Sequence, residues 1–260
     1  MDIAIIFSRK DPAGVNISEC LGKYELGGVN AKIYEVEEET IYHDDLDKKI
    51  DADLFIFTTK HESSKGVHSL SCHVPGNWDK AMLGGIDKKL CVAPALYLKQ
   101  VFLLLNEKGK GINSEITMEC THHGPYLEKP CFFIEIGSND EYWNNKDAGN
   151  IIASVVFEFL KRVKEDSISM NCDVAFGVGG LHYCNNFNKV QLRTNIAIGH
   201  ICPKYMLEKL DSEMILQAMS KTIPKPSFVL LDWKGLGREK QRIVNLLNEL
   251  GIEYRRTDQL

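Results

Sequence analysis

The residues of this 260-residue chain with the strongest potential for chemistry form the block Thr121-His122-His123-Gly124-Pro125. Neutral imidazoles bind zinc and also transfer protons during hydrolysis, so two adjacent histidines favour a metal site or an acid–base site. On an extended strand the two side chains would point to opposite faces, so they can converge only if the backbone turns at Gly124-Pro125. The sequence therefore predicts a reactive centre at this turn.

A second candidate is Glu135, which lies in the middle of an apolar run typical of a fully buried strand. An isolated ionised carboxylate there would be costly, so Glu135 must be protonated, paired or bound to a cation. A hydrogen bond to the backbone or to an arginine would also satisfy it. If the strands on either side of residues 124–129 pair antiparallel, Glu119 could lie opposite Glu135, and such a pair would need a cation or a shared proton.

The other histidines of interest follow predicted strands. His61, His68 and His73 lie in a Ser- and Gly-rich segment after the strand 54–59, which we predict to be a polar loop. His182 and His200 each end a further predicted strand. Any of them alone is usually an ordinary histidine, and only convergence on one site would give them a chemical role.

The first predicted strand leads into Ser8 and then Asp11-Pro12. Asp11 before a proline is a good N-cap for a helix, and this accounts for it without any function. The alternative is that Ser8, Asp11 and the free N–H groups of the helix face the site, where they would suit a phosphate or a carboxylate.

Known nucleotide and hydrolase motifs do not account for these residues. The glycines at 177, 179 and 180 form a tight turn and do not match a dinucleotide-binding fingerprint. The P-loop, G-x-S-x-G and H-E-x-x-H signatures are absent from the sequence. P-loop NTPase, α/β-hydrolase and zincin functions are therefore excluded.

The elements that must position these side chains are short apolar strands alternating with helical patterns. Such alternation predicts an α/β fold in three α/β/α layers with a mixed, mainly parallel sheet. We expect one domain over 1–260, with a small lobe around 61–90. The predicted strands are 3–8, 32–36, 54–59, 90–93, 116–121, 132–137, 173–178, 195–201 and 228–232, and the clearest helices are 95–108, 147–163 and 238–250.

Composition restricts the cellular setting. The chain carries 31 Lys and Arg against 36 Asp and Glu, and its apolar runs are far too short for a membrane helix, so we expect a cytoplasmic protein without membrane or DNA partners. Its eight cysteines form no C-x-x-C pair, which favours reduced core thiols. The basic segment 221–260 could hold RNA phosphates, although a solvated helix surface explains it equally well.

Taken in order, several motifs resemble the archaeal-type D-aminoacyl-tRNA deacylases, a family shared with plants. The resemblance covers essentially the whole chain and implies a phosphorylase/hydrolase-like fold, hydrolysis of the ester joining a D-amino acid to tRNA, and two zinc ions per subunit. One departure lies at residues 182–187, where the family leads us to expect a proline-containing His-Tyr-x-Pro-x-Phe. The motifs are Ser8-x-x-Asp11-Pro12-Ala13, His61…His73…Gly76-Asn77, Thr121-His122-His123-Gly124-Pro125, Phe133-Ile-Glu135-Ile-Gly137-Ser138, Gly180-x-His182-Tyr183 and Gly199-His200.

On this resemblance we assign roles to three sets of residues. The expected catalytic residues are His122, His123 and Glu135, and the expected zinc ligands are His73, His122, His182, His200 and Glu135. The expected substrate-binding residues are Ser8, Asp11, Asn77, Glu119, Arg238 and Arg255. A zinc ion held by imidazoles and a carboxylate would bring bound water to a pKa near ~7 and polarise the ester carbonyl.

Two other classes of function compete with the deacylase. The same general fold could serve a zinc-dependent exopeptidase or a nucleoside phosphorylase, although the chain lacks a recognisable peptidase metal motif. A non-catalytic tRNA-binding protein would explain the basic segment but gives no reason for a buried glutamate beside paired histidines. We expect a monomer, because nothing in the sequence argues for assembly.

Overall fold

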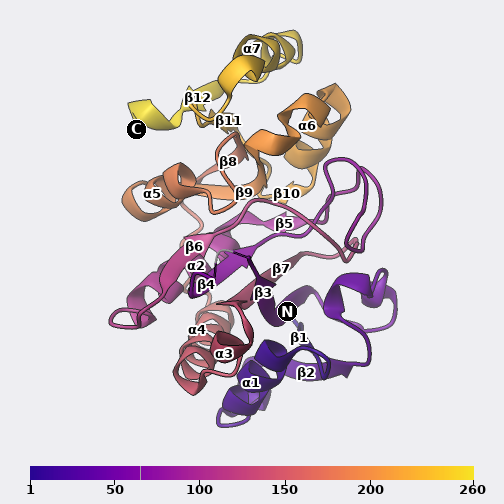
Figure 1. The fold of residues 1–260 in the computed structure, drawn as a ribbon, viewed down its shortest axis with the longest axis vertical. Helices are drawn as coiled ribbons and strands as arrows, with labels where there is room; N and C mark the ends of the chain where they lie inside the picture. The colour runs from indigo at the N-terminus through magenta and orange to yellow at the C-terminus, as the bar shows by residue number, and fades with distance from the viewer. Residues whose placement is uncertain (65) are drawn as a thin grey trace.

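The computed structural model describes residues 1–64 and 66–260, which form two main sheets and a separate two-stranded sheet (Figure 1). The larger sheet has six strands in the order β2-β1-β3-β7-β4-β6, and the smaller has four in the order β12-β11-β8-β9. The predicted α/β fold with a mixed, mainly parallel sheet flanked by helices is confirmed. None of the helices among the described residues is both long and apolar enough to cross a membrane.

The larger sheet is parallel except at one strand. β1, β2, β3 and β7 run parallel, whereas β4 is antiparallel to β7 and parallel to β6. The bounds are β1 Ile3–Ser8, β2 Ala31–Val36, β3 Leu54–Glu62, β4 Ser69–His73, β6 Glu115–Met118 and β7 Cys131–Ser138.

The smaller sheet is parallel throughout. Its strands are β8 Asp173–Val178, β9 Ile196–Cys202, β11 Phe228–Leu231 and β12 Tyr254–Arg256, and a separate short pair joins β5 Ala93–Pro94 to β10 Thr222–Ile223. Helix α2 packs on β4 and on β9, so it contacts both sheets. The helices are α1 Pro12–Leu21, α2 Ala95–Lys108, α3 Asp140–Trp143, α4 Lys146–Lys164, α5 Asn185–Arg193, α6 Ser212–Ser220 and α7 Lys240–Glu249.

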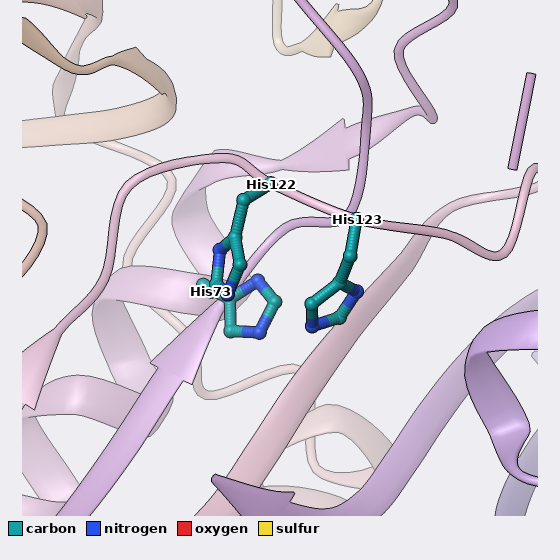
Figure 2. Close-up of side chains that lie close together, drawn as sticks. All are labelled: His73, His122 and His123. Atoms are coloured by element: carbon teal, nitrogen blue, oxygen red, sulfur yellow. The ribbon is translucent and has the colours of Figure 1, made fainter. Parts of the chain in front are cut away.

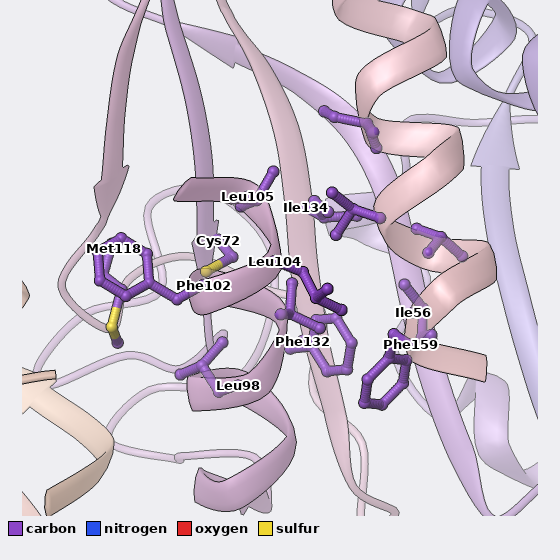
Figure 3. Close-up of a cluster of buried hydrophobic side chains, with 14 of the residues drawn as sticks. Ile56, Cys72, Leu98, Phe102, Leu104, Leu105, Met118, Phe132, Ile134 and Phe159 are labelled. Atoms are coloured by element: carbon purple, nitrogen blue, oxygen red, sulfur yellow. The ribbon is translucent and has the colours of Figure 1, made fainter. Parts of the chain in front are cut away.

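The main core lies between the larger sheet and helices α1, α2 and α4 (Figure 3). Alternate strand residues such as Ile56, Cys72 and Ile134 point to these helices. Their neighbours Phe57 and Phe133 point to the other face, which irregular segments cover. Burial of the strands on both faces explains why they read as continuous apolar runs.

One element was wrong in the sequence prediction. Residues 69–73, predicted as part of a polar loop, form the buried strand β4 inside the larger sheet. The serines of Ser-Leu-Ser-Cys-His look like loop residues, yet all five residues of this strand are buried. This polar segment becomes a strand because it pairs with β7 on one side and β6 on the other. The last residue of β4 is His73, which the strand thereby places at the site.

Candidate active site

A pocket of about 290 Å³ opens beyond the carboxyl ends of β1 and β3. Ligands of parallel α/β sheets bind at this edge of the sheet, as the sequence led us to expect. Its floor is made of histidines and a glutamate, whereas its mouth carries both charged and apolar side chains. The floor residues are Thr59, His61, His122, His123, Glu135 and His182; the buried Asp11 and Thr40 also line the pocket, and the partly or fully exposed Glu39, Ile41, Tyr42, Lys60, Glu62 and Leu83 lie at the mouth.

Three imidazoles converge at this pocket, His122 and His123 on its floor and the buried His73 beside them, as Figure 2 shows. The ring centroids lie 4.2 Å apart for His73 and His122, 4.8 Å for His73 and His123, and 4.3 Å for His122 and His123. His73 comes from the end of β4 and the other two from the loop after β6. One nitrogen from each ring lies within 4.8 Å of the others, which is the spacing of ligands around one metal ion.

The turn that brings the adjacent histidines together lies at His123 itself. Its φ of 43° is left-handed, so the backbone already turns at His123, one residue before the predicted Gly124-Pro125, in the loop that follows β6. The loop is also bonded to its neighbours, since Gly76 donates its backbone N–H to the His123 carbonyl at 2.8 Å. The predicted convergence of His122 and His123 is present, but the backbone turns at a different residue from the one predicted.

Hydrogen bonds orient both rings for ligation. Nδ1 of His122 lies 2.8 Å from the Cys120 carbonyl and Nδ1 of His123 lies 2.6 Å from the Gly124 carbonyl, so each Nδ1 carries the proton. Burial and then the neighbouring His73 lower the pKa of both imidazoles, that of His123 to about 4. Both rings are therefore neutral and present Nε2 lone pairs, the form that binds zinc.

Two carboxylates complete the floor. Glu135, on β7, accepts a hydrogen bond from Thr59 Oγ1 at 2.7 Å, and its Oε2 lies 3.5 Å from His73 Nε2. Glu119 and Glu135 do approach each other, with oxygens within 4.8 Å of one another and of a His73 nitrogen. The pairing suggested from sequence is wrong, because β4 separates the strands and puts Ser71 opposite Glu135.

Glu119 also binds a second pair of histidines. His182 Nε2 lies 2.9 Å from Glu119 Oε2, and His61 Nδ1 lies 3.1 Å from Oε1. Burial favours the neutral carboxyl, but the hydrogen bonds from His182 and His61 outweigh it and hold the pKa of Glu119 well below its usual range. Burial opposes protonation of His182 as well, yet bonds to Cys120 and Glu119 raise its pKa to about 10.

Buried atoms without partners show where a cation would fit. Among the described residues, both ring nitrogens of His73 and Oε2 of Glu135 are buried and have no hydrogen-bond partner. Such atoms are expensive unless an ion or water satisfies them. Four groups in the described residues could each hold a metal ion: His73, His122 and His123; His73, Glu119 and Glu135; His61, Glu119 and His182; and Cys120, His122 and His182.

Asp11 reaches the pocket as predicted and also caps helix α1. Its carboxylate accepts the backbone N–H groups of Gly14 at 2.9 Å and Lys60 at 2.8 Å. Burial raises its pKa to about 6, although these two bonds favour the ionised form. Ser8 does not line the pocket, because its buried hydroxyl accepts the Lys10 N–H and shapes the turn into the helix.

His200 is separate from the cluster, contrary to its expected role as a ligand. Its Nδ1 lies 3.1 Å from Thr121 Oγ1 and its Nε2 lies 2.9 Å from the Cys91 carbonyl. Both nitrogens are therefore occupied inside the protein, and burial lowers the pKa of the ring to about 4. This histidine joins β9 to the loop before the active-site histidines and belongs to the core.

Three predicted substrate-binding residues also have other contacts. Asn77 donates from Nδ2 to the Gly84 carbonyl at 2.9 Å and holds the 78–89 loop. Arg238 pairs with Glu208 and Glu239, and Arg255 pairs with Glu253 at 3.0 Å and Asp173 at 3.4 Å. Both arginines are neutralised by acids in this structure and neither lines the pocket.

Sequence reasoning did not assign roles to His61 and Thr59. β3 runs to Glu62, three residues further than predicted, so Thr59 and His61 lie two apart on one face of this strand. A sequence signal for the longer strand was present, because the period-two alternation of side chains continues through Thr-Thr-Lys-His-Glu. Polar residues at the end of a strand are, however, also typical of a loop. His68 does not join them, since its ring stacks on Tyr142 at 4.1 Å.

The chain is similar to known proteins over nearly its whole length. A family model described as D-aminoacyl-tRNA deacylase matches residues 48–255. The D-aminoacyl-tRNA deacylase of Pyrococcus furiosus is 37% identical over 96% of this chain and 98% of its own length, and that of Saccharolobus solfataricus is 34% identical over 98% and 100%. A crystal structure of a conserved protein of unknown function superposes with a TM-score of 0.87 at 30% identity, covering 99% of this chain and 96% of that one.

Proposed function

The chain belongs to the D-aminoacyl-tRNA deacylase family, and we propose that its reaction takes place on the pocket floor formed by His122, His123 and Glu135. The protein is a hydrolase that splits the ester between a D-amino acid and tRNA, adding water and releasing both products. Exopeptidase, nucleoside phosphorylase and purely RNA-binding functions are not favoured by this membership. The observation that carries the assignment is the convergence of three imidazoles and two buried carboxylates at one pocket.

Zinc suits the donor set, since His122 and His123 are neutral imidazoles whose Nδ1–H groups are bonded to backbone carbonyls, the usual form of a zinc ligand. We assign His73, His122 and His123 to one ion and His61, Glu119 and His182 to another. The two groups share no residue, which supports the expected number of two ions. When bound, zinc would supply an activated water at neutral pH and polarise the ester carbonyl.

The chain's own residues then have three tasks. Asp11 binds the α-ammonium of the D-amino acid, because its buried carboxylate lines the same pocket as the reactive residues. Glu135 Oε2 has no hydrogen-bond donor among the described residues and accepts the proton that the attacking water loses. Thr59 holds the other oxygen of Glu135 and so fixes the direction of Oε2. The departing ribose oxygen takes up a proton as tRNA is released.

Turnover of the two enantiomers tests the assignment. We expect release of D-tyrosine from D-tyrosyl-tRNA to be far faster than release of L-tyrosine from L-tyrosyl-tRNA. The variants Glu135→Gln and His123→Ala should lose the activity, whereas His43→Ala should keep it, since His43 lies outside the pocket lining. Equal rates on both enantiomers, or full activity of the Glu135→Gln variant, would contradict the proposal.

Metal analysis tests the cofactor separately. We expect about two zinc ions per purified chain, loss of activity on prolonged chelation and recovery on adding zinc. His73→Ala should lower the zinc content, because this residue belongs to one of the assigned groups. A chelated protein that is metal-free and fully active would refute the zinc assignment while leaving the deacylase activity standing.

Location and assembly stay predictions. We propose a cytoplasmic, monomeric enzyme that does not bind DNA, because its substrate is tRNA and the chain is acidic overall. Sedimentation of the purified protein and fractionation of its source cells test these points.

A further inference from the structure

The mouth of the pocket has an apolar side that the proposed chemistry does not use. Ile41, Tyr42 and Leu83 line the pocket next to the charged floor. Tyr42 is 54% exposed and Leu83 is 53% exposed, so both side chains face solvent at the entrance. We call Tyr42 and Leu83 the rim. Because Tyr42 and Leu83 are exposed together and line the same pocket as Ile41, they form an apolar patch at its entrance, and such patches beside a pocket mark binding surfaces.

The rim is attached directly to the catalytic histidine turn. Gly124, which follows His123, donates its backbone N–H to the Leu83 carbonyl at 2.9 Å. A Cβ on Gly84 would lie 1.8 Å from the Ile41 carbonyl oxygen, so the two segments of the rim touch through their backbones. Asn77 holds the same loop by donating to the Gly84 carbonyl. The rim therefore has a fixed position relative to His123.

The size of the pocket determines which part of the substrate can meet the rim. About 290 Å³ is at the lower end of pockets that hold one small molecule, so the polynucleotide must remain outside. The ester has to reach Glu135 and the histidines, and the amino acid attached to its carbonyl carbon enters with it. The ribose and its base, on the other side of the ester, are left at the mouth, where Tyr42 and Leu83 lie.

We propose, building on the function proposed above, that the rim binds the terminal adenine base of tRNA by stacking on Tyr42, with Leu83 packing beside it. Base stacking on an aromatic side chain tolerates any base and depends on one flat exposed ring. The rim thus positions the ribose ester over the floor and is a binding subsite, not a catalytic group. The amino-acid side chain is the alternative occupant, and the test distinguishes the two.

The first experiment measures inhibition by uncharged tRNA with and without its terminal adenosine. The native protein should bind intact tRNA more tightly than the shortened tRNA by about five- to 150-fold, the range given by stacking of one base. Tyr42→Ala should reduce this ratio to near one, and Tyr42→Phe should preserve it. Leu83→Ala should reduce it in part, whereas Leu216→Ala, with 51% exposure on α6, should not change it.

The second experiment compares KM for D-tyrosyl-tRNA and D-alanyl-tRNA. If the rim holds the base, Tyr42→Ala raises both values by the same factor, because the base is common to both substrates. A rise confined to D-tyrosyl-tRNA would assign the rim to the amino-acid side chain and overturn the proposal. An unchanged inhibition ratio in folded Tyr42→Ala protein would also overturn it.

Failure of the subsite and failure of the enzyme give different results. If native protein hydrolyses D-tyrosyl-tRNA but the Tyr42 variants behave as native, only the rim assignment is wrong. If Glu135→Gln protein is fully active while Tyr42→Ala protein still loses the inhibition ratio, the catalytic floor is misassigned and the rim stands. Thermal unfolding of each variant confirms that the compared proteins are folded.

Discussion

Replacing Gly124 by alanine tests the connection between the rim and the catalytic histidines. A Cβ there would lie 2.2 Å from the Gly85 nitrogen, 2.4 Å from the Gly84 carbonyl carbon and 2.5 Å from the Ile41 carbonyl oxygen. All three are backbone atoms, so no side-chain rotation can relieve the overlap. Reaching ordinary van der Waals contact requires a displacement of roughly 1 Å.

The expected loss follows from this displacement. A shift of about 1 Å at a group that positions catalytic residues can lower turnover by about 100-fold. Overpacking of this kind also destabilises by about 1–3 kcal/mol, which lowers Tm by roughly 2–10 °C in a chain of this length. We therefore expect Gly124→Ala protein to fold at 25 °C but to hydrolyse D-tyrosyl-tRNA about 100-fold more slowly.

The assays are steady-state deacylation and thermal unfolding, run beside Gly27→Ala as a matched control. A Cβ on Gly27 would have no neighbour within 4 Å, so this variant should keep native turnover and nearly native Tm. Native turnover and native Tm in Gly124→Ala protein would refute the close packing of rim and histidine turn.

Two further predictions concern buried hydrogen bonds. The pKa of His200 is near 6.5 in the unfolded chain, and burial lowers it to about 4 in the native protein. The stability that this histidine contributes is therefore complete above pH 6.5 and falls by about 3 kcal/mol as the pH decreases to 4. His200→Gln should flatten this dependence in urea unfolding, and parallel curves for both proteins would contradict the assignment. Thr59→Val removes the donor to Glu135 and should lower turnover by about 10- to 100-fold, as measured by kcat. Unchanged values would show that Glu135 needs no such support.

Local patterns explain how much of the fold was predictable. The predicted helix 95–108 and the strands 3–8 and 173–178 agree with the structure to the residue, because apolar periodicity is encoded within each segment. Burial of a carboxylate inside an apolar strand is a local property with an unavoidable cost, so the need of Glu135 for a partner could be predicted. The partner found on one oxygen, the Thr59 hydroxyl, was not among those expected.

The composition of the site depended on long-range packing. Both His61 and His200 end strands in the sequence, yet one faces Glu119 and the other bonds Thr121 and Cys91. Their sequence neighbours cannot distinguish them, because the outcome depends on which strand lies beside each. The insertion of β4 between β7 and β6 decided that His73 belongs to the cluster.

The sequence by itself determined the α/β class, the apolar strands and the presence of a His- and Glu-based chemistry. Tertiary structure alone decided which of those side chains meet, since period-two alternation defines two faces but not the strand that each face will neighbour. It also placed Tyr42 and Leu83 at the entrance, through backbone contacts between glycines far apart in the chain. Side chains without chemical reactivity, such as these two, carry no sequence signal of a binding role. Only their position at the pocket entrance indicates that role.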